Sequence, residues 1–138
     1  MSISISGAQS AINAAFSKAS ELGIAVCVAV LDEGANLKAF ARMDRAWLGA
    51  ADVAVKKART SVLFEIDTQS VWEFCKPEGQ AHGLEATNGG LVTFAGGIPV
   101  RGVDGRLWGA VGVSGGQVEQ DAQVAQAAAR ALSSTSPE

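Results

Sequence analysis

The sequence predicts an α+β fold in which a five-stranded antiparallel sheet is flanked by helices. Two observations carry this prediction: five short segments have the apolar or alternating pattern of strands, and short turns separate most neighbouring pairs of them. Strands joined by short turns run antiparallel, because a parallel pair needs a long crossover. The 138 residues, 48% hydrophobic and 18% charged, predict one domain spanning residues 1–138 with an apolar core.

Four helices are predicted from apolar residues that recur at helical spacing. A capping box formed by Ser6 and Gln9 begins the first helix, and Gly23 ends it. The third helix begins at Ser70 and is short, because Pro77 disfavours helical geometry in the residue before it. The four predicted helices span residues 8–22, 48–62, 70–75 and 118–132.

Five strands are predicted between these helices. The run of residues 24–31 is continuously apolar and rich in β-branched residues, which is typical of a central strand covered on both faces. The Asp104-Gly105 dipeptide predicts a hairpin between the last two strands. Gly109 and Gly112 in the last strand predict close approach of another backbone or a ligand. The five predicted strands span residues 24–31, 37–43, 91–95, 98–103 and 107–113.

Composition and charge argue against several kinds of partner. A net charge of −3 without any basic run argues against nucleic acid. The longest apolar run, residues 24–31, is far shorter than the roughly 20 residues that cross a bilayer, so we expect no membrane span. The N-terminus lacks the pattern of a secretory signal, which favours a cytoplasmic location. Cys27 and Cys75 are expected to be reduced packing residues, and with a single histidine in the chain no metal site is expected.

Residues 77–90 form a long segment without helical or strand periodicity, and they carry the only histidine of the chain. Long irregular segments inside compact domains are often functional. His82 and Glu85 supply an imidazole and a carboxylate three residues apart, and Thr87 and Asn88 add a hydroxyl and an amide. Such a set can move protons and hold a polar ligand. The alternative is that His82 is a loop residue that makes ordinary hydrogen bonds.

Arg42 and Asp44 end the second predicted strand. They can clamp a carboxylate, or they can pair with each other on the surface in an ion pair worth at most about 1 kcal/mol.

The glycine-rich run of residues 109–116 leads from a strand into a helix, as phosphate-binding loops do. It lacks both the dinucleotide-binding spacing and a lysine followed by serine or threonine. In addition, Glu119 and Asp121 open the next helix and repel an anion. Phosphate binding is therefore not expected there.

Several motifs in this order resemble those of one family. They are Ala29-Val30-Leu31-Asp32-x-Gly34, Phe40-Ala41-Arg42-Met43-Asp44, Lys56-Lys57-Ala58-Arg59-Thr60, Phe94-Ala95-Gly96-Gly97-Ile98-Pro99-Val100, and Gly109-Ala110-Val111-Gly112-Val113-Ser114-Gly115 with Glu119-x-Asp121. Together they resemble the GlcG/HbpS family, which includes the C-terminal domain of PduO-type proteins. The resemblance covers nearly the whole chain.

The resemblance implies a profilin-like domain with five antiparallel strands that assembles into homo-oligomers, often octamers. It also implies an association with catabolic operons and haem or a related planar ligand as the cofactor. By residue type alone, His82, Met43 and Cys75 each qualify as an axial ligand of haem iron.

Three hypotheses follow for the function. In the first, the protein is an oligomeric binding module whose pocket holds haem or another tetrapyrrole. In the second, the protein is an enzyme that acts on a small carboxylated intermediate by tautomerisation, hydration or hydrolysis, with His82, Glu85, Arg42 and Asp44 as catalytic residues. In the third, the glycines serve only packing and subunit contact. For the first two we expect the loop around His82 to close a pocket with these ligand-binding residues: Phe94, Gly96, Gly97, Pro99, Thr87 and Asn88.

Overall fold

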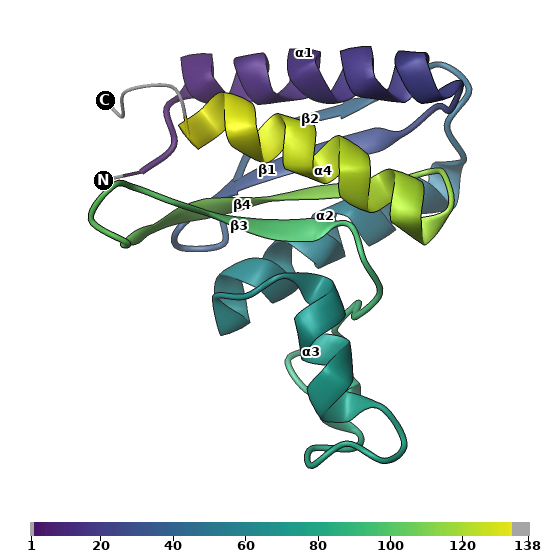
Figure 1. Ribbon diagram of the computed structural model, residues 1–138, viewed down its shortest axis with the longest axis vertical. Helices are drawn as coiled ribbons and strands as arrows, with labels where there is room; N and C mark the ends of the chain where they lie inside the picture. Colours follow the sequence, from purple (N-terminus) through teal and green to yellow (C-terminus); the bar gives the residue numbers. More distant parts are fainter. Residues whose placement is uncertain (1, 134–138) are drawn as a thin grey trace.

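A computed structural model describes residues 2–133 and confirms the α+β class with an antiparallel sheet between helices (Figure 1). Within these residues the sheet has four strands in the order β2-β1-β4-β3, so that β1 and β4 are central. All three neighbouring pairs are antiparallel. The elements are α1 (Ile5–Leu22), β1 (Cys27–Asp32), β2 (Leu37–Arg42), α2 (Leu48–Phe64), α3 (Thr68–Cys75), the 3-10 helix η1 (Leu84–Ala86), β3 (Gly97–Arg101), β4 (Leu107–Ser114) and α4 (Val118–Ser133).

Helices cover both faces of the sheet (Figure 1). On one face, Val28 and Val30 of β1 belong to the core that α1 and α4 cover. On the other face, Ala29 and Leu31 of the same strand pack with Ala54 of α2. Successive side chains of a strand point to opposite faces, so a strand covered on both sides is apolar along its whole length. No helix among residues 2–133 has both the length and the hydropathy needed to cross a membrane.

Two glycines of β4 bring backbones close together, as predicted. A Cβ atom on Gly112 would collide with the carbonyl oxygen of Ala54, so α2 lies directly on the strand at this point. A Cβ atom on Gly109 would collide with the carbonyl oxygen of Leu31 in β1, and Gly109 has a φ of 154°. The close approach is therefore to neighbouring backbone, and glycine is what allows α2 to pack against the sheet.

Two of the predicted helices begin earlier than expected. The cap of α1 is Ser4 rather than Ser6, since the Ser4 hydroxyl accepts a hydrogen bond from the N–H of Gly7 at 2.9 Å. The cap of α3 is Asp67, whose carboxylate accepts from the N–H of Ser70 at 2.9 Å. Ser70 therefore lies inside the helix. Each of these two helix starts contains more than one polar residue that could cap the helix. The residue that does so accepts, through its side chain, from the backbone N–H three residues later, which has no partner within the helix.

The prediction of a fifth strand at residues 91–95 is wrong. These residues have no regular structure, although Leu91 and Thr93 are buried and Phe94 is 46% exposed. Gly90 and Gly96 at the two ends adopt positive φ values of 101° and 130°, which bend the chain away from an extended path. Alternating burial is therefore achieved here by a segment that lies against the body without joining the sheet.

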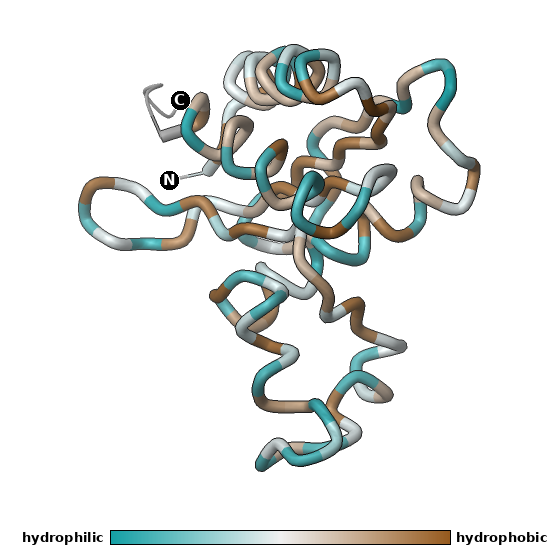
Figure 2. The backbone as a smooth tube through the Cα atoms, turned by 45° about the vertical axis from the view of Figure 1, so that its right-hand side comes forward, coloured by the Kyte–Doolittle hydropathy of each residue, from teal (hydrophilic) through white to brown (hydrophobic). Residues whose placement is uncertain are grey.

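Residues 68–90, which we call the arm, project from the body (Figure 1). Turned by 45°, the molecule shows the same projection, with hydrophobic and hydrophilic segments along it (Figure 2). The arm is held to the body at its base, where the guanidinium of Arg59 donates to the carbonyl oxygen of Asn88 at 2.7 Å. Within the arm, the N–H of Ala81 donates to the carbonyl oxygen of Phe74 at 2.8 Å. The irregular segment predicted at residues 77–90 is thus the outer part of this arm.

Candidate functional site

The imidazole of His82 lies on the arm and is exposed. Its Nδ1 atom lies 3.3 Å from the backbone carbonyl oxygen of Cys75. A carbonyl can only accept, so a neutral ring in this contact carries its proton on Nδ1 and keeps the lone pair on Nε2. Such a contact fixes both the tautomer and the orientation of a ligating histidine. The arm therefore presents an imidazole nitrogen that can bind a metal-containing group.

The other three predicted residues of the arm have different surroundings. Thr87 donates its hydroxyl proton to the carbonyl oxygen of Leu84 at 2.6 Å, and the amide of Asn88 donates to the Thr87 hydroxyl at 3.0 Å. These two residues thus hold the turn that follows η1. The Oε1 atom of Glu85 is buried and has no hydrogen-bond partner within residues 2–133. The structure therefore places all four predicted residues on the arm, and three of them, His82, Thr87 and Asn88, take part in hydrogen bonds within it.

Arg42 and Asp44 lie at the end of β2, which is the opposite edge of the sheet from β3. Arg42 donates to the carbonyl oxygen of Ala46 at 3.3 Å. In the described part of the chain, Arg42 and Asp44 form no ion pair with each other. The nearby sulfur of Met43 accepts the N–H of Val26 at 3.3 Å. The structure does not bring Arg42 and Asp44 together with the arm.

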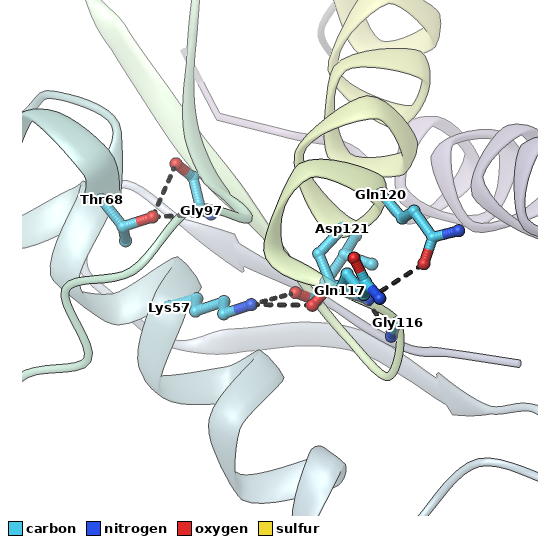
Figure 3. A network of polar contacts seen from close by, with 8 residues as sticks. Lys57, Thr68, Gly97, Gly116, Gln117, Gln120 and Asp121 are labelled. Atoms are coloured by element: carbon cyan, nitrogen blue, oxygen red, sulfur yellow. Dashed lines mark hydrogen bonds and ion pairs between the residues drawn. The ribbon is translucent and has the colours of Figure 1, made fainter. Parts of the chain in front are cut away.

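A pocket of about 530 Å³, which we call the Gly97 pocket, opens where β3 begins, between α3 and α4. It contains the predicted residues Gly96, Gly97 and Pro99. Thr68 lines it too, and its hydroxyl accepts the N–H of Gly97 at 3.0 Å (Figure 3). The residues that line the Gly97 pocket are Asp67, Thr68, Gln69, Ala95, Gly96, Gly97, Ile98, Pro99, Ala122 and Gln126.

A second pocket of about 290 Å³, which we call the Trp47 pocket, contains the predicted residue Phe94. The Trp47 ring is 77% exposed, so the pocket has an aromatic rim. Neither pocket has His82 among the residues that line it, so the expected closure by the loop around His82 is not found within one chain. The residues that line the Trp47 pocket are Trp47, Gly49, Ala50, Val53, Phe94, Ser114, Gly115 and Gly116.

An ion pair between Lys57 and Asp121 lies in the interior, and sequence reasoning missed it. The Lys57 ammonium is fully buried and donates to Asp121 Oδ2 at 3.1 Å and to the carbonyl oxygen of Val113 at 2.8 Å (Figure 3). The other carboxylate oxygen of Asp121 accepts the N–H of Gly116 at 2.9 Å. The Lys57 ammonium also lies over the ring of Phe94, 4.9 Å from its centroid. The pair thus joins α2 to α4 and to the end of β4.

Burial shifts the pKa of Lys57 and the pKa of Asp121 in the directions that favour their neutral forms. Desolvation lowers the pKa of Lys57 below its usual value, although the charge of Asp121 opposes this shift. Desolvation likewise raises the pKa of Asp121, against the effect of Lys57 and of the N–H of Gly116. A perturbed ionisable pair beside a pocket is a candidate functional site.

A signal for Lys57 is present in the sequence. Ala50, Ala54 and Ser61 are all buried in α2, and Lys57 lies at helical spacing from each of them. A lysine on the buried stripe of a helix needs a partner, because an isolated buried charge is very unfavourable. The partner itself is 64 residues away and cannot be found from spacing.

The fold and the site together define a small α+β protein with a four-stranded antiparallel sheet, pockets beside it, and a projecting, histidine-bearing arm. Residues 3–130 match the family model described as haem degrading protein HbpS-like, and the chain belongs to this family. The resemblance to the GlcG/HbpS family is thereby confirmed.

Curated and solved relatives agree with this assignment. An uncharacterised 15.0 kDa protein from the dhaT-dhaS intergenic region of Citrobacter freundii is 36% identical over 127 residues, covering 91% of this chain and 89% of that protein. The crystal structure of protein ORFY from Klebsiella pneumoniae has a TM-score of 0.93 at 35% identity and covers 97% of this chain and 92% of that one. The crystal structure of a complex of PduOC with haem has a TM-score of 0.91 at 32% identity, with full coverage of both chains.

Proposed function

We propose that this protein binds haem and that His82 is an axial ligand of the iron. The orientation of the imidazole carries this proposal, because the contact between Nδ1 and the carbonyl oxygen of Cys75 leaves Nε2 free to bind a metal. Two comparisons support it: the family is described by haem degradation, and the similar PduOC structure is a complex with haem.

The other residues that qualify by type are less suited to reach a ligand. Cys27 and Cys75 are completely buried, and the sulfur of Met43 accepts a backbone hydrogen bond. Among the described residues that line the Gly97 pocket or the Trp47 pocket, none is a histidine, cysteine or methionine. No group of three or more potential metal ligands occurs in residues 2–133. In this proposal the metal is iron that the porphyrin ring of haem already holds. The exposed ring of His82 remains as the ligand.

The Gly97 pocket and the Trp47 pocket suit the porphyrin ring of haem, whereas we assign the iron to His82 on the arm. A haem-binding site needs an apolar slot as well as an axial ligand. Phe94 and the exposed Trp47 offer aromatic surface in the Trp47 pocket, and Gly96, Gly97 and Pro99 offer backbone and apolar surface in the Gly97 pocket. When bound, haem supplies redox and oxygen chemistry at its iron. In this proposal His82 binds and orients the group, while Thr87 and Asn88 hold the turn beside it.

The separation of His82 from both pockets suggests that the ligand site is shared between copies of the chain. We therefore propose that the protein forms a homo-oligomer. The family resemblance implies that this oligomer is an octamer. Trp47 and Leu48, at the start of α2, are 77% and 78% exposed, and adjacent large apolar side chains of this kind commonly mark a contact surface. We also propose a role beside a catabolic pathway, which the family resemblance implies.

The alternative of an acid–base enzyme is less well supported. It requires Arg42 and Asp44 to act with His82 and Glu85, but the first two lie at the far edge of the sheet. No observation brings these four groups around one substrate.

Titration with haem, followed by absorbance, tests the proposal. We expect a Soret band that grows to saturation with the wild-type protein and is shifted or weakened in His82→Ala. Gln80→Ala is the matched control, because Gln80 is an exposed residue of the same arm. An unchanged spectrum in His82→Ala would exclude this residue as the ligand, and the absence of any Soret band with the wild-type protein would overturn haem binding.

A further inference from the structure

The Lys57–Asp121 pair lies directly behind one wall of the Trp47 pocket. Ser114, Gly115 and Gly116 form that wall. The carbonyl oxygen of the preceding residue accepts from Lys57, and the N–H of Gly116 donates to Asp121. The ammonium is therefore separated from the pocket by a layer of small residues on one side and by the ring of Phe94 on the other.

Among residues 2–133, two hydrogen-bond acceptors contact the Lys57 ammonium, and none contacts its third N–H group. Of its three N–H groups, two point to the acceptors Val113 and Asp121, while the face of the Phe94 ring lies over the nitrogen. Phe94 belongs to the irregular segment before β3, lines the Trp47 pocket and is 46% exposed. Rotation of this one ring into solvent would open a path from the pocket to the nitrogen of Lys57.

We propose that Lys57 forms a Schiff base with a small apolar aldehyde or ketone that enters the Trp47 pocket past the ring of Phe94. The walls of the pocket are mostly apolar, with Ala50 and Val53 beside Trp47. These walls suit a ligand with a short hydrocarbon chain. The carbonyl oxygen of this ligand can accept a hydrogen bond from the third N–H group of Lys57. The aldehyde would occupy the Trp47 pocket, which the haem proposal also uses, but its reaction with Lys57 requires neither haem nor His82.

The charges of the site favour a neutral ligand over an anion. Asp121 already balances the charge of Lys57, and Glu119 opens the same helix, so a carboxylate ligand would place excess negative charge in a partly desolvated site. A carbonyl compound adds no net charge.

The pKa shifts of Lys57 and Asp121 described above favour the neutral amine, which is the reactive form of lysine. A lysine in an apolar, desolvated environment reacts as the neutral amine, and burial lowers the pKa of Lys57 while it raises that of Asp121. Transfer of one proton from the ammonium to the carboxylate yields an amine next to a carboxylic acid. The pair thus contains both a nucleophile and a proton donor.

The reaction is balanced by these two groups and the ligand. The Lys57 nitrogen attacks the carbonyl carbon and forms a C–N bond, and transfer of an amine proton to the former carbonyl oxygen gives a neutral carbinolamine. Asp121 then donates its proton to the hydroxyl, the C–O bond breaks, and water leaves. The products are a protonated Schiff base on Lys57, a carboxylate on Asp121 and one water molecule, with no oxidant or reductant consumed.

Trapping with butanal and cyanoborohydride at neutral pH, followed by peptide mass spectrometry, tests the proposal on the wild-type protein without haem. Burial lowers the pKa of Lys57, so we expect Lys57 to be labelled about tenfold faster than the lysines on the surface. The internal references are Lys18, Lys38, Lys56 and Lys76. Labelling of these residues with none at Lys57, or labelling of Lys57 at the same rate as theirs, would overturn the proposal.

Two variants test the path to the nitrogen. Phe94→Ala removes the ring above Lys57, and we expect its labelling to become several-fold faster while the exposed lysines keep their rates. Phe40→Ala is the matched control, because Phe40 is 37% exposed on β2 at the other edge of the sheet. An unchanged rate at Lys57 in Phe94→Ala would refute entry past this ring. The wild-type measurement decides the reaction itself even if a variant fails to fold.

Discussion

The Nζ atom of Lys57 and the Oδ2 atom of Asp121 lie 3.1 Å apart, and both side chains are buried. One belongs to α2 on one face of the sheet and the other to α4 on the opposite face, so the contact passes beside the end of β4 (Figure 3). The carbonyl oxygen of Val113 and the N–H of Gly116 complete the hydrogen bonding of the two charges. The pair links the two helical layers directly, which makes it a suitable target for experiments on stability.

Removal of one member of the pair is expected to destabilise the protein strongly. Lys57→Met leaves the carboxylate of Asp121 buried without its cation, and loss of one partner of a buried pair costs about 3–5 kcal/mol. The double variant Lys57→Met, Asp121→Leu removes both charges and is expected to recover most of this loss. Urea unfolding of the wild-type, single and double variants measures the effect. A double variant as unstable as the single one would show that the charges are not coupled.

The stability contributed by Lys57 is expected to depend on pH. Burial lowers the pKa of Lys57 in the folded state, so between that lowered pKa and the usual lysine pKa of 10.5 the unfolded chain binds more protons than the folded one. Stability linked to Lys57 therefore rises as the pH rises through this range. The free energy of unfolding of the wild type, minus that of Lys57→Met, should therefore increase as the pH rises toward 10.5. A difference that stays constant or falls over this range would contradict the burial of Lys57 as its cause.

Gly112 is expected to tolerate no side chain. A Cβ atom there would collide with the carbonyl oxygen of Ala54, so Gly112→Ala should destabilise the protein by about 1–3 kcal/mol through displacement of α2. Gly49→Ala is the matched control in α2, where a Cβ meets nothing within 4 Å, and alanine should stabilise the helix by about 0.5–1 kcal/mol. Thermal unfolding of both variants gives the comparison. Equal effects of the two substitutions would contradict the close packing of α2 on β4.

Residues 47 and 48 are expected to lie in the contact between copies of the chain. Trp47→Ser combined with Leu48→Ser should convert a homo-oligomer to smaller species in sedimentation velocity, because it removes two exposed apolar side chains. Val103→Ser, at the fully exposed tip of the β3–β4 hairpin, should leave the assembly unchanged. A wild-type protein that sediments as a monomer would refute the proposed oligomer.

The elements with local signals could be predicted from the sequence. Helical stripes and the capping glycine at position 23 identified the helices, and the continuous apolar run of residues 24–31 identified the central strand β1. Residues 91–95 show the limit of such signals, because alternating burial arises in any segment that lies against the body. Only hydrogen bonding to a neighbour distinguishes a strand, and this depends on distant parts of the chain.

The candidate site was predictable only in part for the same reason. Gly96, Gly97 and Pro99 do line a pocket, and His82 does lie in an irregular, exposed segment. The direction in which the arm leaves the body depends on few contacts at its base, such as that of Arg59 with Asn88, and no local pattern encodes it. The pairing of Lys57 with Asp121 likewise depends on the packing of two helices from opposite faces of the sheet.

Chemical rescue of the axial ligand tests the central claim most directly. The haem complex of His82→Gly should lose the Soret position of the wild type and regain it when imidazole is added, because free imidazole fills the place of the missing side chain. Gln80→Gly, treated in the same way, should match the wild type before and after the addition. A His82→Gly complex whose spectrum equals that of the wild type without imidazole would contradict iron binding by His82.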